Sequence, residues 1–245
     1  MNVSLQIPLR FKEQVEDLAR ELFYCVLETS TSQKQQLDSI KKSFFKVSEG
    51  LECGLCENKW DLFETEIKTL DQLLYLDAKA AYDTDPAAKS IKEVYLSYPG
   101  FYAITMYRIS HILWSLDIPI LPRMISEYAH SVTGTDIHPG ATIGSAFFID
   151  HATGVVIGET SIIGNNVTIY QGVTLGGIKV DKSLNNIKRH PTILDYVTIY
   201  ANATILGGDV VIGENSVIGA NVWITQSIPK NSVVTYKSDI KISSI

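Results

Sequence analysis

Two pairs of adjacent polar residues, Asp150-His151 and Arg189-His190, carry the side chains of this sequence that are best suited to chemistry. An imidazole titrates near neutral pH, so a positioned histidine such as His151 can take a proton from a weak nucleophile. A guanidinium such as that of Arg189 binds a carboxylate through two parallel hydrogen bonds. The two pairs are therefore candidates for proton transfer and for the recognition of an anionic group.

The elements that must position these pairs repeat with a period of six residues. Thirteen aliphatic residues share this register: Ile137, Ile143, Ile149, Ile157, Ile163, Ile169, Leu175, Ile193, Ile199, Ile205, Ile212, Ile218 and Ile224. A six-residue step is one short strand and one tight turn, and three steps make a triangular coil that buries its aliphatic residues only when coils stack. The repeat predicts a parallel β-helix rather than a set of unrelated turns.

Function is expected where the repeat is interrupted, because the regular coils already satisfy the fold. The step from Ile149 to Ile157 is eight residues long and contains Asp150-His151. The step from Leu175 to Ile193 is eighteen residues long, and its non-repeat segment predicts an extruded loop that ends in Arg189-His190. Such a loop can cover a site and exclude water from a reacting group. The step from Ile205 to Ile212 has seven residues and predicts a one-residue bulge.

The part of the sequence before residue 133 has helical spacing instead. Apolar residues recur every three or four positions in two stripes: Phe11, Val15, Leu18, Leu22 and Val26, and then Phe63, Ile67, Leu70 and Leu74, widened by Leu62 and Leu73. The apolar segment 101–116 predicts a buried helix. Asp85-Pro86 and Tyr98-Pro99-Gly100 predict breaks, since proline disfavours helix at the residue before it.

Composition excludes several classes of protein. The net charge is −6, which argues against a nucleic-acid partner. No run approaches the roughly 18 apolar residues that span a bilayer, and no secretory signal is visible, so we expect no membrane association. The three cysteines predict reduced thiols in a cytoplasmic protein, and the lone Cys53-Cys56 pair is interpreted as two cysteines on a helix face.

Three runs together resemble serine O-acetyltransferase, a family of hexapeptide-repeat acyltransferases. They are IDHATGVVIGET (149–160), QGVTLGG (171–177) and RHP (189–191), and TDIHPGATIG (135–144) and TDPAA (84–88) fit the same family. The resemblance implies an α+β fold, with an N-terminal α-helical domain (1–132) before a C-terminal left-handed parallel β-helix (133–234). Loop 177–191 interrupts the β-helix, and a tail (235–245) follows it. It also implies a homotrimer, or a hexamer made of two trimers, with active sites between neighbouring β-helices.

The family reaction transfers acetyl from acetyl-CoA to the L-serine hydroxyl, the first step of cysteine biosynthesis from serine. By resemblance, His151 is the general base and Asp136 is the carboxylate that orients it. Asp85 and Asp150 hold the serine ammonium, while Arg189 and His190 contact the serine on the loop. The small residues implied beside the CoA arm are Gly177, Ala201 and Ala220. No metal is implied.

The sequence departs from the family in its longer loop and in the segment after the last coil, IPKNSVVTYKSD (228–239). Many family members place a C-terminal Ile in the active site of O-acetylserine sulfhydrylase, and Ile245 suits that role. Feedback inhibition by cysteine is a family implication as well.

Other interpretations remain open at this stage. The candidate residues have structural readings, since Asp150-His151 can cap a corner, Asp136 and Asp85 can begin turns, and Arg189-His190 can be solvated. A hexapeptide-repeat O-acetyltransferase acting on a sugar would keep the base but need no clamp for an amino acid. A zinc enzyme of the γ-carbonic-anhydrase type needs three converging histidines, and His138, His151 and His190 lack the familiar spacing. A scaffold with a decayed site is a further alternative.

Overall fold

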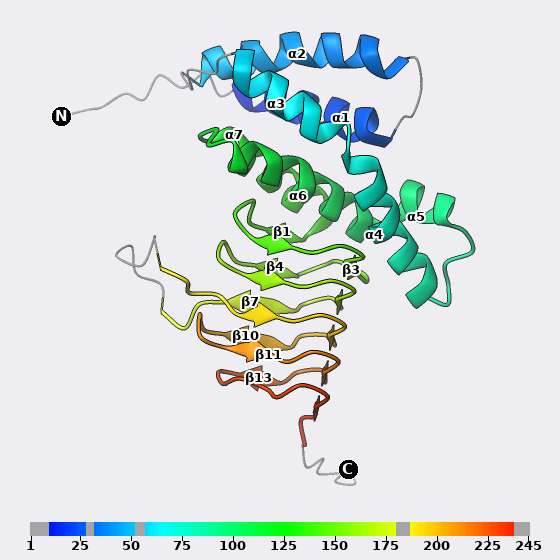
Figure 1. Ribbon diagram of the computed structural model, residues 1–245, viewed down its shortest axis with the longest axis vertical. Helices are drawn as coiled ribbons and strands as arrows, with labels where there is room; N and C mark the ends of the chain where they lie inside the picture. Colours follow the sequence, from blue (N-terminus) through cyan, green and yellow to red (C-terminus); the bar gives the residue numbers. More distant parts are fainter. Residues whose placement is uncertain (1–9, 28–31, 52–56, 180–186, 238–245) are drawn as a thin grey trace, which may run out of the picture.

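The computed structural model describes residues 10–27, 32–51, 57–179 and 187–237. In this part of the chain, seven helices precede fourteen short strands (Figure 1). The helices are α1 (Phe11–Leu27), α2 (Ser32–Gly50), α3 (Glu57–Ile67), α4 (Leu70–Thr84), α5 (Ile91–Ser97), α6 (Pro99–Ser115) and α7 (Leu121–Thr133). Cys53, Cys56 and Ile245 lie outside the described residues.

The helical predictions are largely confirmed. The first apolar stripe is the buried face of α1, and segment 101–116 is the buried helix α6. The second stripe belongs to two helices, because α3 ends at Ile67 and α4 begins at Leu70. Helices α2 and α7 were not singled out from the pattern. Both predicted breaks occur, since α4 ends before Asp85 and Pro99 begins α6.

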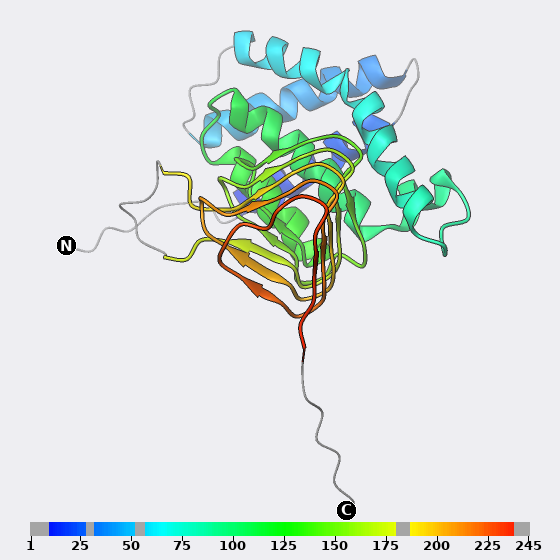
Figure 2. The ribbon, with the colours of Figure 1, turned by 60° about the horizontal axis from the view of Figure 1, so that its bottom comes forward.

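The strands form a left-handed parallel β-helix with three sheets (Figure 2). Sheet A holds β1 (Asp136–Ile137), β4 (Val156–Ile157), β7 (Thr174–Gly176), β10 (Thr204–Leu206) and β13 (Trp223–Ile224). Sheet B holds β2 (Thr142–Ile143), β5 (Ile162–Ile163), β8 (Thr192–Ile193) and β11 (Val211–Ile212). Sheet C holds β3 (Phe148–Ile149), β6 (Thr168–Ile169), β9 (Thr198–Ile199), β12 (Val217–Ile218) and β14 (Val233–Val234).

The six-residue repeat maps onto β1 to β13 one to one, while β14 follows the last residue of the repeat. Each of the thirteen aliphatic residues lies in β1 to β13 and is buried in one core. Small residues at the corners, such as Ala141, Ala203 and Ser216, are also buried and fill the space between them. Several tight corners use asparagine with positive φ, including Asn166, Asn202 and Asn221. Asparagine tolerates the left-handed conformation better than most residues with a Cβ.

Two names for the edges of the prism are useful below. The His151 edge is the set of corners between sheets C and A: residues 150–155, 170–173, 200–203 and 219–222. The His190 edge is the set of corners between sheets A and B: residues 138–141, 158–161, the described parts of 177–191, and 207–210. The two edges lie at opposite ends of the strands of sheet A.

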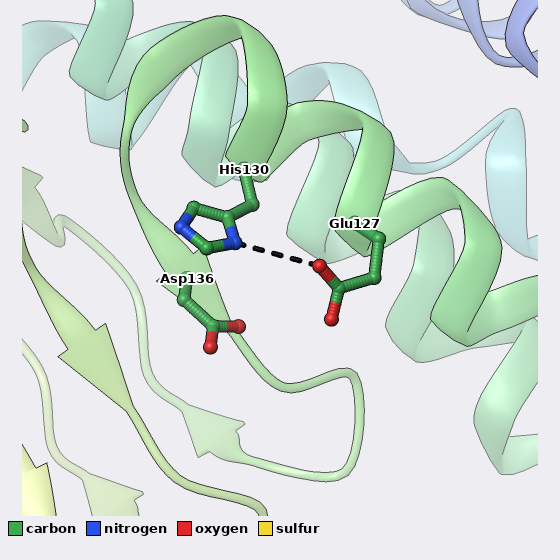
Figure 3. A group of neighbouring side chains, drawn as sticks. All are labelled: Glu127, His130 and Asp136. Carbon is green, nitrogen blue, oxygen red and sulfur yellow. Dashed lines mark hydrogen bonds and ion pairs between the residues drawn. The ribbon is translucent and has the colours of Figure 1, made fainter.

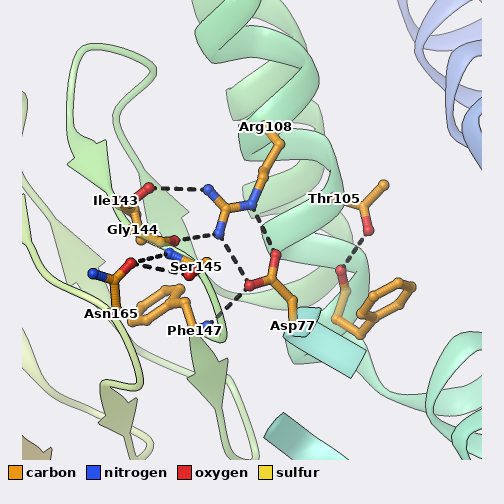
Figure 4. A network of polar contacts seen from close by, with 9 residues as sticks. Asp77, Thr105, Arg108, Ile143, Gly144, Ser145, Phe147 and Asn165 are labelled. Carbon is orange, nitrogen blue, oxygen red and sulfur yellow. Dashed lines mark hydrogen bonds and ion pairs between the residues drawn. The ribbon is translucent and has the colours of Figure 1, made fainter. Parts of the chain in front are cut away.

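A buried ion pair joins the helices to the first coil (Figure 4). Arg108 of α6 donates from Nε and Nη2 to the carboxylate of Asp77 on α4, at 2.8 and 3.0 Å. It also donates to the carbonyl oxygens of Ile143 and Gly144, at 3.0 and 2.6 Å. Asp77 in turn accepts from the Phe147 N–H at 2.9 Å. The pair therefore fixes α4 and α6 on the β-helix.

Candidate active site

The eight-residue step in the repeat forms a strained corner. His151 and Ala152 both have positive φ, +60° and +66°. Two tight turns follow one another here. The Ala152 N–H donates to the backbone carbonyl oxygen of Asp150 at 2.7 Å, and the Thr153 N–H donates to that of His151 at 2.8 Å. Residues with a Cβ rarely adopt this backbone, and such strain is typical of functional sites. The corner directs the His151 side chain away from the prism, and this side chain is 67% exposed.

Two carboxylates from different parts of the chain flank His151. The Asp150 Oδ2 lies 3.6 Å from the His151 Nε2. Asp85, directly after α4, is near enough for the charge of the same imidazole to contribute to the lowered pKa of the Asp85 carboxyl. Burial raises the pKa of Asp150, and the nearby Asp85 charge raises it further. The structure thus brings Asp85 and Asp150 near His151, and their roles toward a substrate stay a prediction.

Tyr98 was not predicted to belong to this group. Its hydroxyl donates to the Asp85 Oδ2 at 2.5 Å, while the Ala87 N–H donates to the Oδ1 at 2.8 Å. Both hydrogen bonds lower the pKa of the Asp85 carboxyl, and the bond from Tyr98 has the larger effect. Burial and the bond to Asp85 raise the pKa of Tyr98 to about 12, so the phenol remains a donor. Its place before Pro99 signalled only a break in the helix.

Close packing of α6 sets the distance between these groups. Tyr98 caps α6, and the second residue of that helix, Gly100, lies against the carbonyl oxygen of Ile149. A Cβ at Gly100 would clash with this oxygen. Because Ile149 directly precedes Asp150, a larger residue at position 100 would push the helices away from the His151 corner.

The second pair lies on the His190 edge. His190 is buried, and its Nδ1 accepts from the Thr160 N–H at 3.0 Å. Burial, followed by the charge of Arg189, lowers the pKa of His190 to about 4. The imidazole is therefore neutral at pH 7, and since Nδ1 accepts, Nε2 carries the proton. His190 is thus a hydrogen-bond donor rather than a base.

Arg189 is held beside His190 by residues of the preceding coil. Its guanidinium forms an ion pair with Glu159, and its backbone N–H donates to the Thr160 Oγ1 at 2.9 Å. The side chain of Arg189 is 23% exposed, so it is not fully enclosed. Thr160 was not predicted from the sequence, where nothing marks it apart from its neighbours.

The two clusters are separated within one chain. At about 3.3 Å per residue, the roughly six residues of one side place the edges roughly 15–20 Å apart. Ala201 and Ala220 occupy successive coils on the His151 edge, linked by the bond from the Asn221 N–H to the Ala201 oxygen, 3.0 Å. Gly177 lies on the His190 edge, where an added Cβ would be 3.3 Å from the Arg189 oxygen.

Asp136 contacts α7 rather than the imidazole of His151. Its Oδ1 lies 3.6 Å from Nη1 of Arg123, which also pairs with Glu127. No hydrogen bond or ion pair among the described residues joins Asp136 to His151. Figure 3 shows Asp136 beside Glu127 and His130, whose ligand atoms lie within 4.8 Å of one another. Because Arg123 forms ion pairs with both carboxylates, this group is an ion-pair network and does not by itself define a metal site.

The histidines proposed for a zinc site do not converge within one chain. His138 is a corner residue of the His190 edge, and its Nδ1 accepts from the Gly140 N–H at 3.0 Å. His190 lies on the same edge, while His151 lies on the other.

In the described part of the chain, no helix is both long and apolar enough to cross a membrane.

Comparison with known proteins identifies the family. A Staphylococcus aureus serine acetyltransferase is 48% identical over 158 residues, which cover 64% of this chain and 72% of that protein. The crystal structure of serine acetyltransferase isoform 3 from Entamoeba histolytica, in complex with cysteine, superposes with a TM-score of 0.80 at 36% identity. That match covers 95% of this chain and 84% of the other. The chain belongs to the serine acetyltransferase family.

Further comparisons define how far the likeness extends. A plasmid-encoded serine acetyltransferase of Synechococcus elongatus is 49% identical over 178 residues, 71% of this chain and 56% of that protein. The Bacillus subtilis serine acetyltransferase is 52% identical over 132 residues, 54% of this chain and 59% of its own length. The alignments therefore span little more than half the length of these two relatives. No protein-family model matches the chain.

Proposed function

We propose that this protein is a serine O-acetyltransferase, which transfers acetyl from acetyl-CoA to the hydroxyl of L-serine and produces O-acetyl-L-serine and CoA. The observation that carries the proposal is His151, raised on a strained corner beside the carboxylates of Asp85 and Asp150. A general base flanked by two anions suits a substrate that carries both a hydroxyl and an ammonium group. The product is an activated serine for cysteine biosynthesis.

In the proposed reaction, His151 takes the proton of the serine hydroxyl as its oxygen attacks the thioester carbonyl carbon. The tetrahedral intermediate then collapses, the carbon–sulfur bond breaks, and the imidazolium returns its proton to the CoA thiolate. We assign Asp136 the role of orienting His151, which requires its carboxylate to turn from Arg123, 3.6 Å away. The exposed imidazole of His151 is accessible to both substrates.

The two ends of serine are assigned to the two clusters. Asp85 and Asp150 attract the ammonium group, and this attraction favours the ionised form of Asp150 against the effect of burial. Arg189 binds the carboxylate, and His190 donates from Nε2. A sugar acceptor has neither charged end, so a clamp with carboxylates on one side and a guanidinium on the other favours the amino acid.

The separation of the clusters supports an assembly of several copies. Serine is too small to reach from one edge to the other, so we propose that the His151 edge of one copy faces the His190 edge of the next in a homotrimer. The same interface between two copies would place Ala201 and Ala220 of one copy opposite Gly177 of the next, with the pantetheine arm of acetyl-CoA between them. A hexamer would join two trimers through their helices.

Three further assignments complete the proposal. Residues 1–132 form the helical domain, residues 133–234 form the acyltransferase domain with loop 177–191, and residues 235–245 form the tail. We propose that Ile245 docks into O-acetylserine sulfhydrylase. The scarcity of cysteines, three in the chain, supports a reducing compartment such as the cytoplasm.

One assay tests the activity: thiol release from acetyl-CoA with and without L-serine, with the product identified by mass. We expect serine-dependent release and a product heavier than serine by one acetyl group. A panel of sugars and other hydroxyl compounds is the control. Acetylation of a sugar, with none of serine, would replace this proposal by the sugar acetyltransferase alternative.

A further inference from the structure

Thr160 bonds to the Lys188-Arg189-His190 segment through its N–H, its carbonyl and its hydroxyl. Its N–H donates to the His190 Nδ1 at 3.0 Å, and its carbonyl oxygen accepts from the Lys188 Nζ at 3.0 Å. Its Oγ1 accepts from the backbone N–H groups of Arg189 and His190, at 2.9 and 3.1 Å. The hydroxyl hydrogen is then available for the His190 Nδ1, 2.9 Å from Oγ1.

The neighbouring coils leave little room for this segment to shift. A Cβ at Gly158 would clash with the imidazole of His190, and a Cβ at Gly208 would clash with the carbonyl of Lys188. The segment thus lies between the coil before it and the coil after it. Packing restricts its position, while the bonds to Thr160 determine which way its polar groups point.

These bonds act on both members of the pair. One hydroxyl accepts from two part-buried backbone N–H groups, which favours a single backbone conformation at Arg189 and His190. Both donors of Thr160 face Nδ1 of His190, so the ring proton is placed on Nε2. The hydrogen bond made by one ring nitrogen of a functional histidine commonly determines whether the other nitrogen carries the proton.

We propose that Thr160 is a positioning residue for the carboxylate-binding pair. Its hydroxyl holds the Arg189-His190 backbone, and its backbone N–H together with the hydroxyl keeps the His190 tautomer that donates from Nε2 to the substrate carboxylate. This inference rests on the proposed function, in which Arg189 and His190 bind the serine carboxylate.

The kinetic test compares Thr160→Val with Thr160→Ser. Valine retains the branched shape but removes the hydroxyl, so we expect the KM for serine to rise about 10-fold or more, equivalent to the loss of one hydrogen bond of about 1.4 kcal/mol. The KM for acetyl-CoA should change less than twofold. Serine at position 160 restores the hydroxyl and should return the KM for L-serine to within about threefold of the wild type.

Thr142→Val is the matched control, because it makes the same chemical change on sheet B. Thr142 is exposed, and no hydrogen bond of its hydroxyl is present among the described residues. Its kinetic constants should match those of the wild type. An unchanged serine KM in a folded Thr160→Val protein would overturn the inference.

A spectroscopic test measures the tautomer of His190 directly in the wild-type protein, so its main outcome does not depend on how a variant folds. The chain has five histidines, so ¹⁵N-labelled histidine gives few signals to assign. At pH 7.5 the wild type should show His190 protonated at Nε2 only. Thr160→Val keeps the backbone N–H that faces Nδ1 but loses the hydroxyl, so it should show the same tautomer with a shifted Nδ1 resonance. A wild-type His190 protonated at Nδ1 would overturn the inference.

The two failures can be told apart. If wild-type protein acetylates serine and Thr160→Val does so with the same KM, the positioning role is wrong and the function stands. If the wild type does not acetylate serine, the proposed function is wrong, whatever the tautomer of His190.

Discussion

The two edges of sheet A present their functional side chains in opposite ways. On the His151 edge, the imidazole is 67% exposed and stands on a backbone with positive φ. On the His190 edge, the imidazole is buried and its Nδ1 is fixed by Thr160. The first histidine is accessible and lightly held, whereas the second is enclosed by hydrogen bonds.

This difference matches the two kinds of work proposed for the edges. A general base must gain and lose a proton, so its charge must be able to change during the reaction. A carboxylate-binding pair works best with charges and donors fixed before the substrate arrives, since no reorganisation then accompanies binding. A pKa of about 4 keeps His190 neutral, while Arg189 supplies the positive charge.

The largest expected effect separates the base from the binding pair. His151→Ala should lower kcat by a factor of about 10² to 10⁴, because the serine hydroxyl loses its proton acceptor. Steady-state kinetics measure this loss, and size-exclusion chromatography checks that the assembly is retained. Turnover near the wild-type value in an intact assembly would mean that another group acts as base.

The His151 edge also depends on the helical domain, because α4 carries Asp77 as well as leading into Asp85. Asp77→Asn breaks the buried pair with Arg108 and should lower the free energy of unfolding by about 3–5 kcal/mol. Denaturant titration measures the change. Asp83→Asn, on the same helix but in an exposed pair with Lys79, is the control and should cost less than about 1 kcal/mol. Equal losses in the two variants would show that the buried pair does not fix α4.

On the His190 edge, Arg189→Ala should raise the KM for serine about 10- to 100-fold, since a charge-assisted hydrogen bond to the carboxylate is lost. The KM for acetyl-CoA should change little. Initial rates with each substrate varied in turn provide both values. An unchanged serine KM would remove Arg189 from the clamp and weaken the contrast between the edges.

The smallest expected effect is the change in folding stability with pH that His190 causes. The pKa of His190 is about 4 in the folded protein, below its ordinary value of 6.5. Between these values the unfolded chain binds a proton that the folded chain excludes, so stability falls as the pH decreases from 6.5 to 4. We expect this histidine to contribute roughly 1–2 kcal/mol to that fall, after allowance for solvent screening. The difference in melting temperature between wild type and His190→Gln should be constant above pH 6.5 and should shrink as the pH falls from 6.5 to 4. A difference that does not change over this range would contradict the buried, neutral histidine.

The β-helix was predictable from the sequence strand by strand, and for a physical reason. Every coil must present an aliphatic residue to the same narrow interior, so the period of the pattern equals the period of the structure. The helices were less predictable, because helical spacing continued across the break between α3 and α4. The apolar pattern depends on which face is buried and does not record where a helix ends.

The site divides in the same way. The sequence by itself determined that Asp150-His151 and Arg189-His190 lie at interruptions of a β-helix, because an interruption of a regular repeat is visible in one dimension. Only the tertiary structure decided that Tyr98 bonds to Asp85 near His151, and that Thr160 holds His190, thirty residues away in the chain. Those contacts depend on how α4 and α6 pack on the first coil and on how successive coils stack, and local residue patterns do not encode either distance.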